Sequence, residues 1–218
     1  MKTRSLFFAG VLALSACAGH PPVASEARLD EQSLHLDLVR GMMAQQQYYA
    51  ALAHIQEQRA RGYDSNEIRL LEAEAQRKLK RDAEAERLYR QLLTTALAAD
   101  AYHGLGLLFA GRDPDQSIAN LRRAVQKKPA AAAMRNDLGY ALMLSGRYPE
   151  ALPELATAAE LAPEQTQNTN NLVLLLILMN DETSVKRVAA DAGIGSDRLT
   201  ELRQQAQNLK PQPKNTRG

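Results

Sequence analysis

The chain has 218 residues, and its 27 lysines and arginines against 25 aspartates and glutamates give a formal net charge of +2 at pH 7. Lys2 and Arg4 precede the first acidic residue, and without these two cations the charge is balanced. This balance argues against binding to nucleic acid through clustered cations. The sequence has one cysteine and no tryptophan, and it is rich in Ala, Leu, Gln, Arg and Glu, which favour helices. We therefore expect an all-α protein.

The amino end has the pattern of a secretory signal peptide. Two early cations are followed by the apolar run "SLFFAGVLALSA" at residues 5–16, which ends in small residues. A helix that crosses a bilayer needs about 20 apolar residues, so a permanent membrane span is not expected here. Residues 1–16 are assigned to the signal peptide.

The single cysteine follows directly after this run. Leu14-Ser15-Ala16-Cys17 resembles the lipobox of bacterial lipoproteins. This resemblance implies cleavage after Ala16 and a lipid-modified Cys17, and Ala18 in place of an aspartate implies sorting to the outer membrane, facing the periplasm. An ordinary signal peptide with a chance cysteine is the alternative.

Polar segments rich in proline flank the central part of the chain. Residues 17–30 include "AGHPPVASEA" and predict a flexible tether behind the lipid anchor. Residues 210–218, "KPQPKNTRG", have alternating prolines and predict a disordered tail. The folded domain is expected at residues 31–209.

An internal repeat organises this central part. Its clearest copy, residues 134–163, resembles the 34-residue tetratricopeptide repeat at Leu138, Gly139, Ala141, Gly146, Tyr148, Ala151, Leu155, Ala158 and Pro163. The resemblance implies a solenoid of about four to five helix pairs that wind into a right-handed superhelix. Gly146 is expected to end the first helix of this pair with a positive φ.

Weaker copies stay in phase with this one. The small position of the second helix falls at Ala51, Ala85, Ser117 and Ala151, and the bulky position four residues later falls at Ile55, Tyr89, Leu121 and Leu155. The spacings of 34, 32 and 34 locate a shortening around the loop at 110–116, where Asp113 and Pro114 can start a helix. Pro153 should remove one hydrogen bond inside the next helix.

The carboxyl end of the domain departs from the repeat. Leu172–Met179, "LVLLLILM", is too short to cross a membrane and is expected to be buried core, with an exposed partner site as the alternative. A last helix near residues 196–209 is expected to cap the stack.

The sequence contains no pattern typical of catalysis or of a bound cofactor. His20, His35, His54 and His103 are scattered without the spacing of a metal site. Carboxylates such as Glu72, Glu74, Glu84 and Glu86 are expected on solvated helix faces. We expect a protein that is not an enzyme and holds no metal.

Stacked helix pairs offer an extended concave surface for a protein partner instead. In this register the residues expected to line it are His103, Leu107, Asn136, Tyr140, Met143, Asn170 and Leu174. Each could equally pack between repeats. The groove has too few cations for the carboxylate clamp of chaperone-type repeats.

Lipobox, tether, repeat array and the closing segment "NNLVLLLILMNDETSVKRVAADAG" together resemble the TadD-type lipoproteins of the tight-adherence (Flp) pilus. The resemblance implies an outer-membrane adaptor that helps a pilus secretin to assemble. Three alternatives stay open: a pilotin-like lipoprotein of type IV pili or another secretin system, a recruiter of peptidoglycan enzymes, and a regulatory subunit of an enzyme complex.

Overall fold

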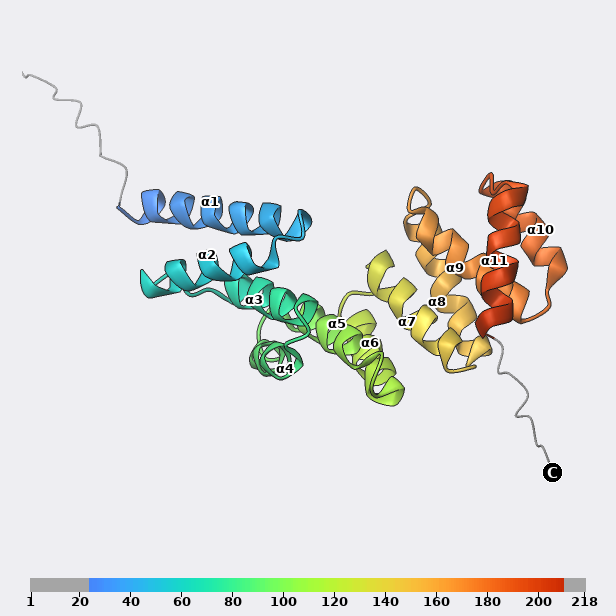
Figure 1. Cartoon of the computed structure of the whole chain (residues 1–218), viewed down its shortest axis with the longest axis horizontal. Coiled ribbons are helices and arrows are strands. Elements are labelled where there is room, and N and C mark those ends of the chain that lie inside the picture. The colour runs from blue at the N-terminus through green and yellow to red at the C-terminus, as the bar shows by residue number, and fades with distance from the viewer. Residues whose placement is uncertain (1–23, 210–218) are drawn as a thin grey trace, which may run out of the picture.

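The chain folds into a row of paired α-helices. The computed structural model describes residues 24–209, and the side chains from residue 31 onward. This part of the chain contains no strand; its helices are α1 (Ala24–Ala44), α2 (Tyr48–Ala60), α3 (Asn66–Lys78), α4 (Asp82–Gln91), α5 (Ala98–Phe109), α6 (Pro114–Lys127), α7 (Ala132–Leu144), α8 (Tyr148–Leu161), α9 (Thr166–Leu178), α10 (Glu182–Asp191) and α11 (Ser196–Leu209). Figure 1 shows them laid side by side from α1 at one end to α10 and α11 at the other.

The order of the helices confirms the predicted architecture of an all-α repeat stack. Five hairpins, α1–α2 to α9–α10, follow one another, and α11 covers residues 196–209, where the capping helix was expected. The predicted boundary of the tether is wrong at its carboxyl end, because α1 already begins at Ala24. The reason is local: "ASEARLDEQ" consists mostly of good helix formers once the prolines are passed. Residues 1–23, with Cys17, and 210–218 lie outside the described residues.

Small and bulky residues meet inside each hairpin as the repeat predicts. The small positions Ala51, Ala85, Ser117 and Ala151 are all 0% exposed. A Cβ atom added to Gly139 of α7 would lie 2.6 Å from Leu155 Cγ of α8, and one added to Gly106 of α5 would lie 2.5 Å from Leu121 Cγ of α6. The paired helices therefore approach so closely that only glycine fits at these two positions.

The turn after α7 closes as expected. Gly146 has a φ of 71°, and its N–H donates to the Met143 carbonyl at 3.0 Å while the Arg147 N–H donates to the Leu142 carbonyl at 2.9 Å. The two bonds satisfy carbonyls at the helix end that would otherwise have no partner.

A different turn joins α5 to α6, inside the loop where the repeat is shortened. The Asp113 N–H donates to the Phe109 carbonyl at 2.8 Å, and the Asp113 side chain accepts from the Gln116 N–H at 3.0 Å. Pro114 occupies the first position of α6. Asp113 and Pro114 therefore start this helix as predicted.

Pro153 lies inside α8, which begins at Tyr148 and continues beyond the proline to Leu161. The helix keeps its register, since Ala151 and Leu155 are fully buried against α7. The cost is one backbone hydrogen bond, because proline has no N–H to donate to the carbonyl four residues earlier.

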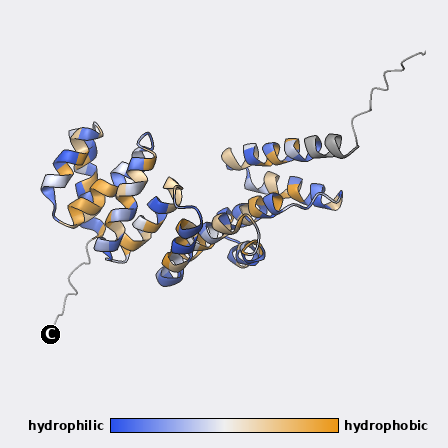
Figure 2. Cartoon of the chain, turned by 180° about the vertical axis from the view of Figure 1, so that it is seen from behind, coloured by the Kyte–Doolittle hydropathy of each residue, from blue (hydrophilic) through white to orange (hydrophobic). Residues whose placement is uncertain are grey.

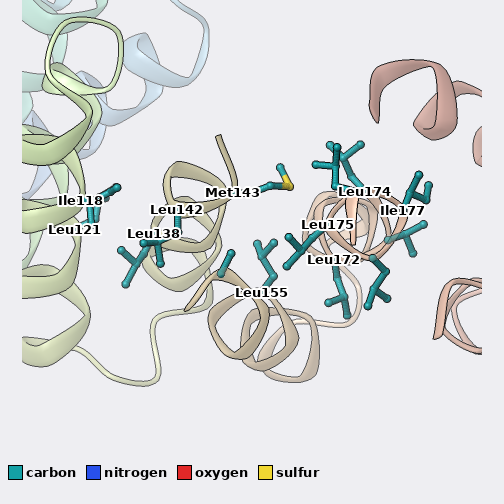
Figure 3. Close-up of a cluster of buried hydrophobic side chains, with 14 of the residues drawn as sticks. Ile118, Leu121, Leu138, Leu142, Met143, Leu155, Leu172, Leu174, Leu175 and Ile177 are labelled. Carbon is teal, nitrogen blue, oxygen red and sulfur yellow. The ribbon is translucent and has the colours of Figure 1, made fainter. Parts of the chain in front are cut away.

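The core is divided along the stack, and its largest cluster fills the C-terminal half (Figure 2). Leu172 to Leu178 are each no more than 8% exposed, which confirms that this run is buried core and not an exposed partner site. In Figure 3, Met143 projects from α7 toward the helix that carries Leu174 and Leu175. Within residues 24–209, no helix combines the length and the apolar character needed to cross a bilayer.

In the last hairpin the small and the large residue exchange helices. In the α5–α6 and α7–α8 pairs, glycine lies on the first helix and leucine on the second. One repeat length after Gly139 and Leu155, the corresponding residues are Val173 of α9 and Ala189 of α10, which are 0% and 5% exposed. The large side chain therefore comes from the first helix of this pair. From Leu172 onward α9 is apolar on every side, and α11 covers it with the buried Leu202 and Ala206.

Candidate partner-binding groove

Two hollows lie along the first helices of the C-terminal repeats. One, of about 160 Å³, is formed by α5, α6 and α7, and includes Leu107, Asp137 and Tyr140 in its lining. The other, of about 310 Å³, is formed by α7, α9 and α11, and is lined by Tyr140, Asn170 and their neighbours. Tyr140 belongs to both. We call this surface, from Leu107 to Asn170, the first-helix groove.

Four of the seven predicted groove residues lie on or beside this surface. Leu107, Tyr140 and Asn170 line the hollows and are half-buried. His103 lies one turn before Leu107 on α5, is also half-buried, and contacts Asp137 of α7.

The other three are in the interior, and their assignment to a partner surface is wrong. Met143 is 2% exposed, Leu174 is 0% exposed and Asn136 is 4% exposed. Met143 and Leu174 belong to the apolar cluster between the repeats, and Asn136 bonds to the next repeat. The physical reason is that α9 packs onto α7, and α11 packs onto α9. Each covers the side of the first helix that carries these residues.

A chain of hydrogen bonds ties the first helices together beneath the groove. His103 Nε2 lies 2.7 Å from Asp137 Oδ2, and Asn136 Nδ2 donates to the other oxygen, Oδ1, of Asp137 at 3.3 Å. Asn171 Nδ2 then donates to Asn136 Oδ1 at 2.9 Å. The chain links α5, α7 and α9, and buried polar groups satisfied in this way fix the relative positions of the helices that carry them.

Carboxylates of α3 and α5 set the charge near His103, where this row of hydrogen bonds begins. The expectation of a solvated face is wrong for Glu72, which is 8% exposed. Glu74 is half-buried, and burial raises the pKa of its carboxyl group, while Arg77 and His103 act in the opposite direction. Nearby Asp100 forms an ion pair with Lys128 Nζ at 2.7 Å. Glu72 pairs with Arg59 at 2.7 Å.

Sequence reasoning missed several polar residues of this surface, among them Asp137, Asn171, Arg198 and Gln205. Asp137 bonds to His103, and Asn171, Arg198 and Gln205 line the second hollow with Asn170. The repeat spacing could have found two of them, because His103, Asp137 and Asn171 follow one another at intervals of 34 residues. Arg198 and Gln205 belong to α11, outside the repeat, and only its packing brings them here.

The described residues contain no group of three or more His, Cys, Asp and Glu side chains that could hold a metal ion. Two of the scattered histidines do meet, since His35 Nδ1 of α1 lies 3.2 Å from His54 Nε2 of α2. His20 lies outside the described residues. The groove offers apolar contact from Tyr140 and Leu107 and hydrogen bonds from amides, which suits binding of a polypeptide segment.

Comparison with known proteins identifies the repeat. A family model described as tetratricopeptide repeat matches residues 103–166. The TPR repeat-containing protein PA4299 of Pseudomonas aeruginosa is 34% identical over 171 residues, which cover 77% of this chain and 67% of that protein.

Solved structures show the same fold at lower identity. TTC0263, a TPR protein of Thermus thermophilus, has a TM-score of 0.63 at 19% identity and covers 82% of this chain and 98% of its own. YrrB, a TPR protein described as having an unusual peptide-binding site, has a TM-score of 0.56 at 16% identity and covers 85% of this chain and 98% of its own. By its repeats, its fold and this relative, the chain belongs to the tetratricopeptide-repeat proteins, whose stacked helix pairs act as scaffolds for protein–protein interaction.

Proposed function

We propose that this protein is a lipid-anchored adaptor of the outer membrane that binds a client protein in its first-helix groove and catalyses no reaction. The observation that carries the proposal is the pair of hollows that share Tyr140. By resemblance to the TadD-type lipoproteins, the client is the secretin of a Flp (tight-adherence) pilus or another component of its assembly.

The geometry of the groove suits an extended segment of a client. Tyr140 supplies a large apolar surface with a polar tip, and Leu107 continues that surface toward α5. Asn170 and Gln205 present amides, which can donate to and accept from the backbone of a bound segment. The hydrogen bonds beneath hold these helices in place, so little ordering is required on binding.

Two further observations support the finer assignment. The stretch from Leu14 to Cys17 matches a lipobox, and a lipid-anchored adaptor needs such an attachment. YrrB, which shares the fold, is described as having a peptide-binding site, so stacked pairs of this type are compatible with a peptide ligand.

Site-specific photocrosslinking in the cell envelope tests the groove. A photoreactive phenylalanine analogue at position 140 is expected to capture the client, whereas the same analogue at position 49 is not. Tyr49 is 68% exposed on α2 at the other end of the stack, and it is therefore a matched control. Capture of cell-wall hydrolases instead of a secretin would replace the pilus role by the recruitment of peptidoglycan enzymes. Equal capture at both positions would contradict the groove.

Fractionation of the envelope tests the anchor. Several acyl chains on one cysteine give firm membrane attachment, so Cys17→Ser should release the protein from the outer-membrane fraction. An unchanged distribution of this variant between membrane and periplasm would contradict lipid anchorage at Cys17.

A further inference from the structure

A larger hollow lies beside the groove, at the C-terminal end of the stack. It has a volume of about 840 Å³ and is enclosed by α8, α9, α10, the loop after α10 and the start of α11. Its apolar lining includes Ala156, Ala159, Leu172, Val188 and Ile194. We call it the end pocket; its size lies in the range of natural binding sites for small groups.

The end pocket exists because two residues are small where earlier repeats have large ones. At the place of Thr169 in α9, the two preceding first helices carry Tyr102 and Arg135. The residues that correspond to Ala159 of α8 in the preceding repeats are Val125 of α6 and Leu93, just after the end of α4, and both pack against the core. The last repeat therefore lacks the volume of one large side chain and of part of a second.

The earlier repeats show how a large side chain is held at this place. Tyr102 packs against the core, and the guanidinium carbon of Arg123 lies 5.5 Å from the centre of its ring. Arg135 donates to Glu154 and to the Pro129 carbonyl, both at 2.6 Å. Each has a planar group with a polar edge, lying over apolar side chains.

Thr169 leaves hydrogen-bonding capacity in the end pocket. It is only 8% exposed and lines the hollow, where its hydroxyl can donate to or accept from a bound polar group.

Charged side chains of both signs also line the end pocket. Arg187 and Arg198 can stack on an aromatic ring, as Arg123 does on Tyr102, while Glu160 and Asp191 can accept from a ring N–H or O–H. An aromatic group with a polar edge meets both requirements.

We propose that the end pocket binds a tyrosine or tryptophan side chain of a partner protein, which takes the place that Tyr102 fills within its own repeat. This is a second contact, on the second-helix side of α9. It borders the first-helix groove at Asn170 and Arg198, which line both hollows, but its apolar lining is separate from that of the groove.

Segments of the same chain fit this description less well. Residues 210–218, which follow α11, contain no aromatic side chain. Tyr49 of a second copy is exposed, but its ring already lies 5.6 Å from the guanidinium carbon of Arg81. A partner that presents an unpaired aromatic residue is therefore favoured over self-association.

The absence of tryptophan from the chain gives a direct measurement. Purified full chain is titrated into the acetylated and amidated pentapeptide Gly-Gly-Trp-Gly-Gly, and the tryptophan emission of the peptide is recorded. A shift of the emission to shorter wavelength is expected as the ring enters the pocket. Two competitor peptides that lack tryptophan, with alanine or tyrosine in the central position, are then added. The alanine peptide should displace the tryptophan peptide at least tenfold less well than the tyrosine peptide does. Equal competition by the two would overturn the proposal.

Variants that fill the end pocket from inside make the test specific. Thr169→Tyr restores the side chain of the earlier repeat, and Ala159→Leu is a second way of filling the same space if the first variant does not fold. Both should abolish the emission shift and raise the melting temperature, whereas Ala119→Leu, on the exposed face of α6, should leave the shift unchanged.

Two results would overturn the assignment. One is unchanged peptide binding by folded Thr169→Tyr or Ala159→Leu. The other is concentration-dependent association of the unaltered chain in sedimentation experiments that either filling variant abolishes, because the occupant would then be a second copy. Tyr140→Ala should leave the peptide signal intact, so that failure of the groove and failure of the end pocket are distinguished.

Discussion

The size of a single side chain is most tightly restricted where the two helices of a pair meet. Gly139 and Leu155 form one such contact, and Gly106 and Leu121 form another, in which an added Cβ would lie 2.5 Å from Leu121 Cγ. Packing this close makes these positions intolerant of one extra methyl group, because neighbouring backbone cannot easily move.

Gly139→Ala is therefore expected to lower the free energy of unfolding by about 1–3 kcal/mol. The new Cβ would meet Leu155 Cγ at 2.6 Å and the Leu155 backbone nitrogen at 3.1 Å. The control is Gly41→Ala on the exposed side of α1, where a Cβ meets nothing within 4 Å, and where alanine should stabilise the helix by roughly 0.5–1 kcal/mol. Urea denaturation of both variants measures this, and equal effects would contradict close packing at Gly139.

Tyr89 adds a dependence on pH. Burial raises the pKa of its hydroxyl group to about 12, and Arg77 Nε, which donates to this hydroxyl at 3.4 Å, opposes the rise. In the unfolded chain a tyrosine ionises near pH 10, so the stabilisation is complete below about pH 10 and is lost as the pH rises toward the folded value.

Between pH 10 and about pH 12, the free energy of unfolding should fall by roughly 2–3 kcal/mol more in the unaltered protein than in Tyr89→Phe. Denaturation with urea at several pH values from 9 to 11.5 measures the difference, and other titrating groups cancel between the two proteins. Parallel curves for both proteins would show that Tyr89 ionises in the folded chain as freely as in the unfolded chain.

The helices themselves follow local chemistry. Asp113 and Pro114 begin α6, Gly146 ends α7, and Ser65 accepts the Ile68 N–H at 3.2 Å at the start of α3. α8 is the element that departs from such rules, since it contains Pro149 in its first turn and Pro153 one turn later. Only the second proline removes a hydrogen bond, because the first N–H groups of a helix have no partner within it.

Pro153→Ala should therefore raise the free energy of unfolding by about 1–3 kcal/mol, by restoring a bond to the Pro149 carbonyl. Pro149→Ala is the matched control, because its N–H stays without a partner in the helix, and little change is expected. Both prolines are exposed, so packing is not altered. Thermal unfolding followed by circular dichroism compares the two, and an equal effect of both substitutions would count against this account.

The whole molecule depends on how its ends are covered. Stacked repeats bury each hairpin against its neighbours, so the terminal hairpin needs a cap with a polar outer face. α11 provides it: Leu202 and Ala206 are each 1% exposed against the cluster that contains α9, while the outward residues Gln204 and Gln207 are exposed.

A chain that ends at Gly195 should expose the apolar side of α9. We expect it to bind the dye ANS and to form concentration-dependent oligomers, and its melting temperature should fall. Sedimentation velocity and dye fluorescence, compared with the full chain, measure these effects. A monomeric truncated chain that binds no dye would show that α11 is not needed as a cap.

The sequence by itself determined the helical class, the pairing of the helices, the helix ends at Asp113–Pro114 and Gly146, and the capping helix, because these follow from spacing and from contacts within about one repeat. It also predicted that the run Leu172–Met179 is core, since a run apolar on every side must be covered on every side. Leu172 to Leu178 are buried, and Met179 is half-buried. The start of α1 was misplaced, because prolines before it outweighed the helix formers that follow.

Only the tertiary structure decided which first-helix residues face solvent. His103, Leu107, Tyr140 and Asn170 stay accessible, whereas Asn136, Met143 and Leu174 turn inward. The repeat pattern fixes the face of a helix that meets its own partner. The rotation of each pair against the next is set by contacts between successive pairs, such as those of α6 with α7, α8 with α9 and α7 with α9. The end pocket arises in the same way, from the combined small size of Thr169 and Ala159 on two helices that only the stacking brings together.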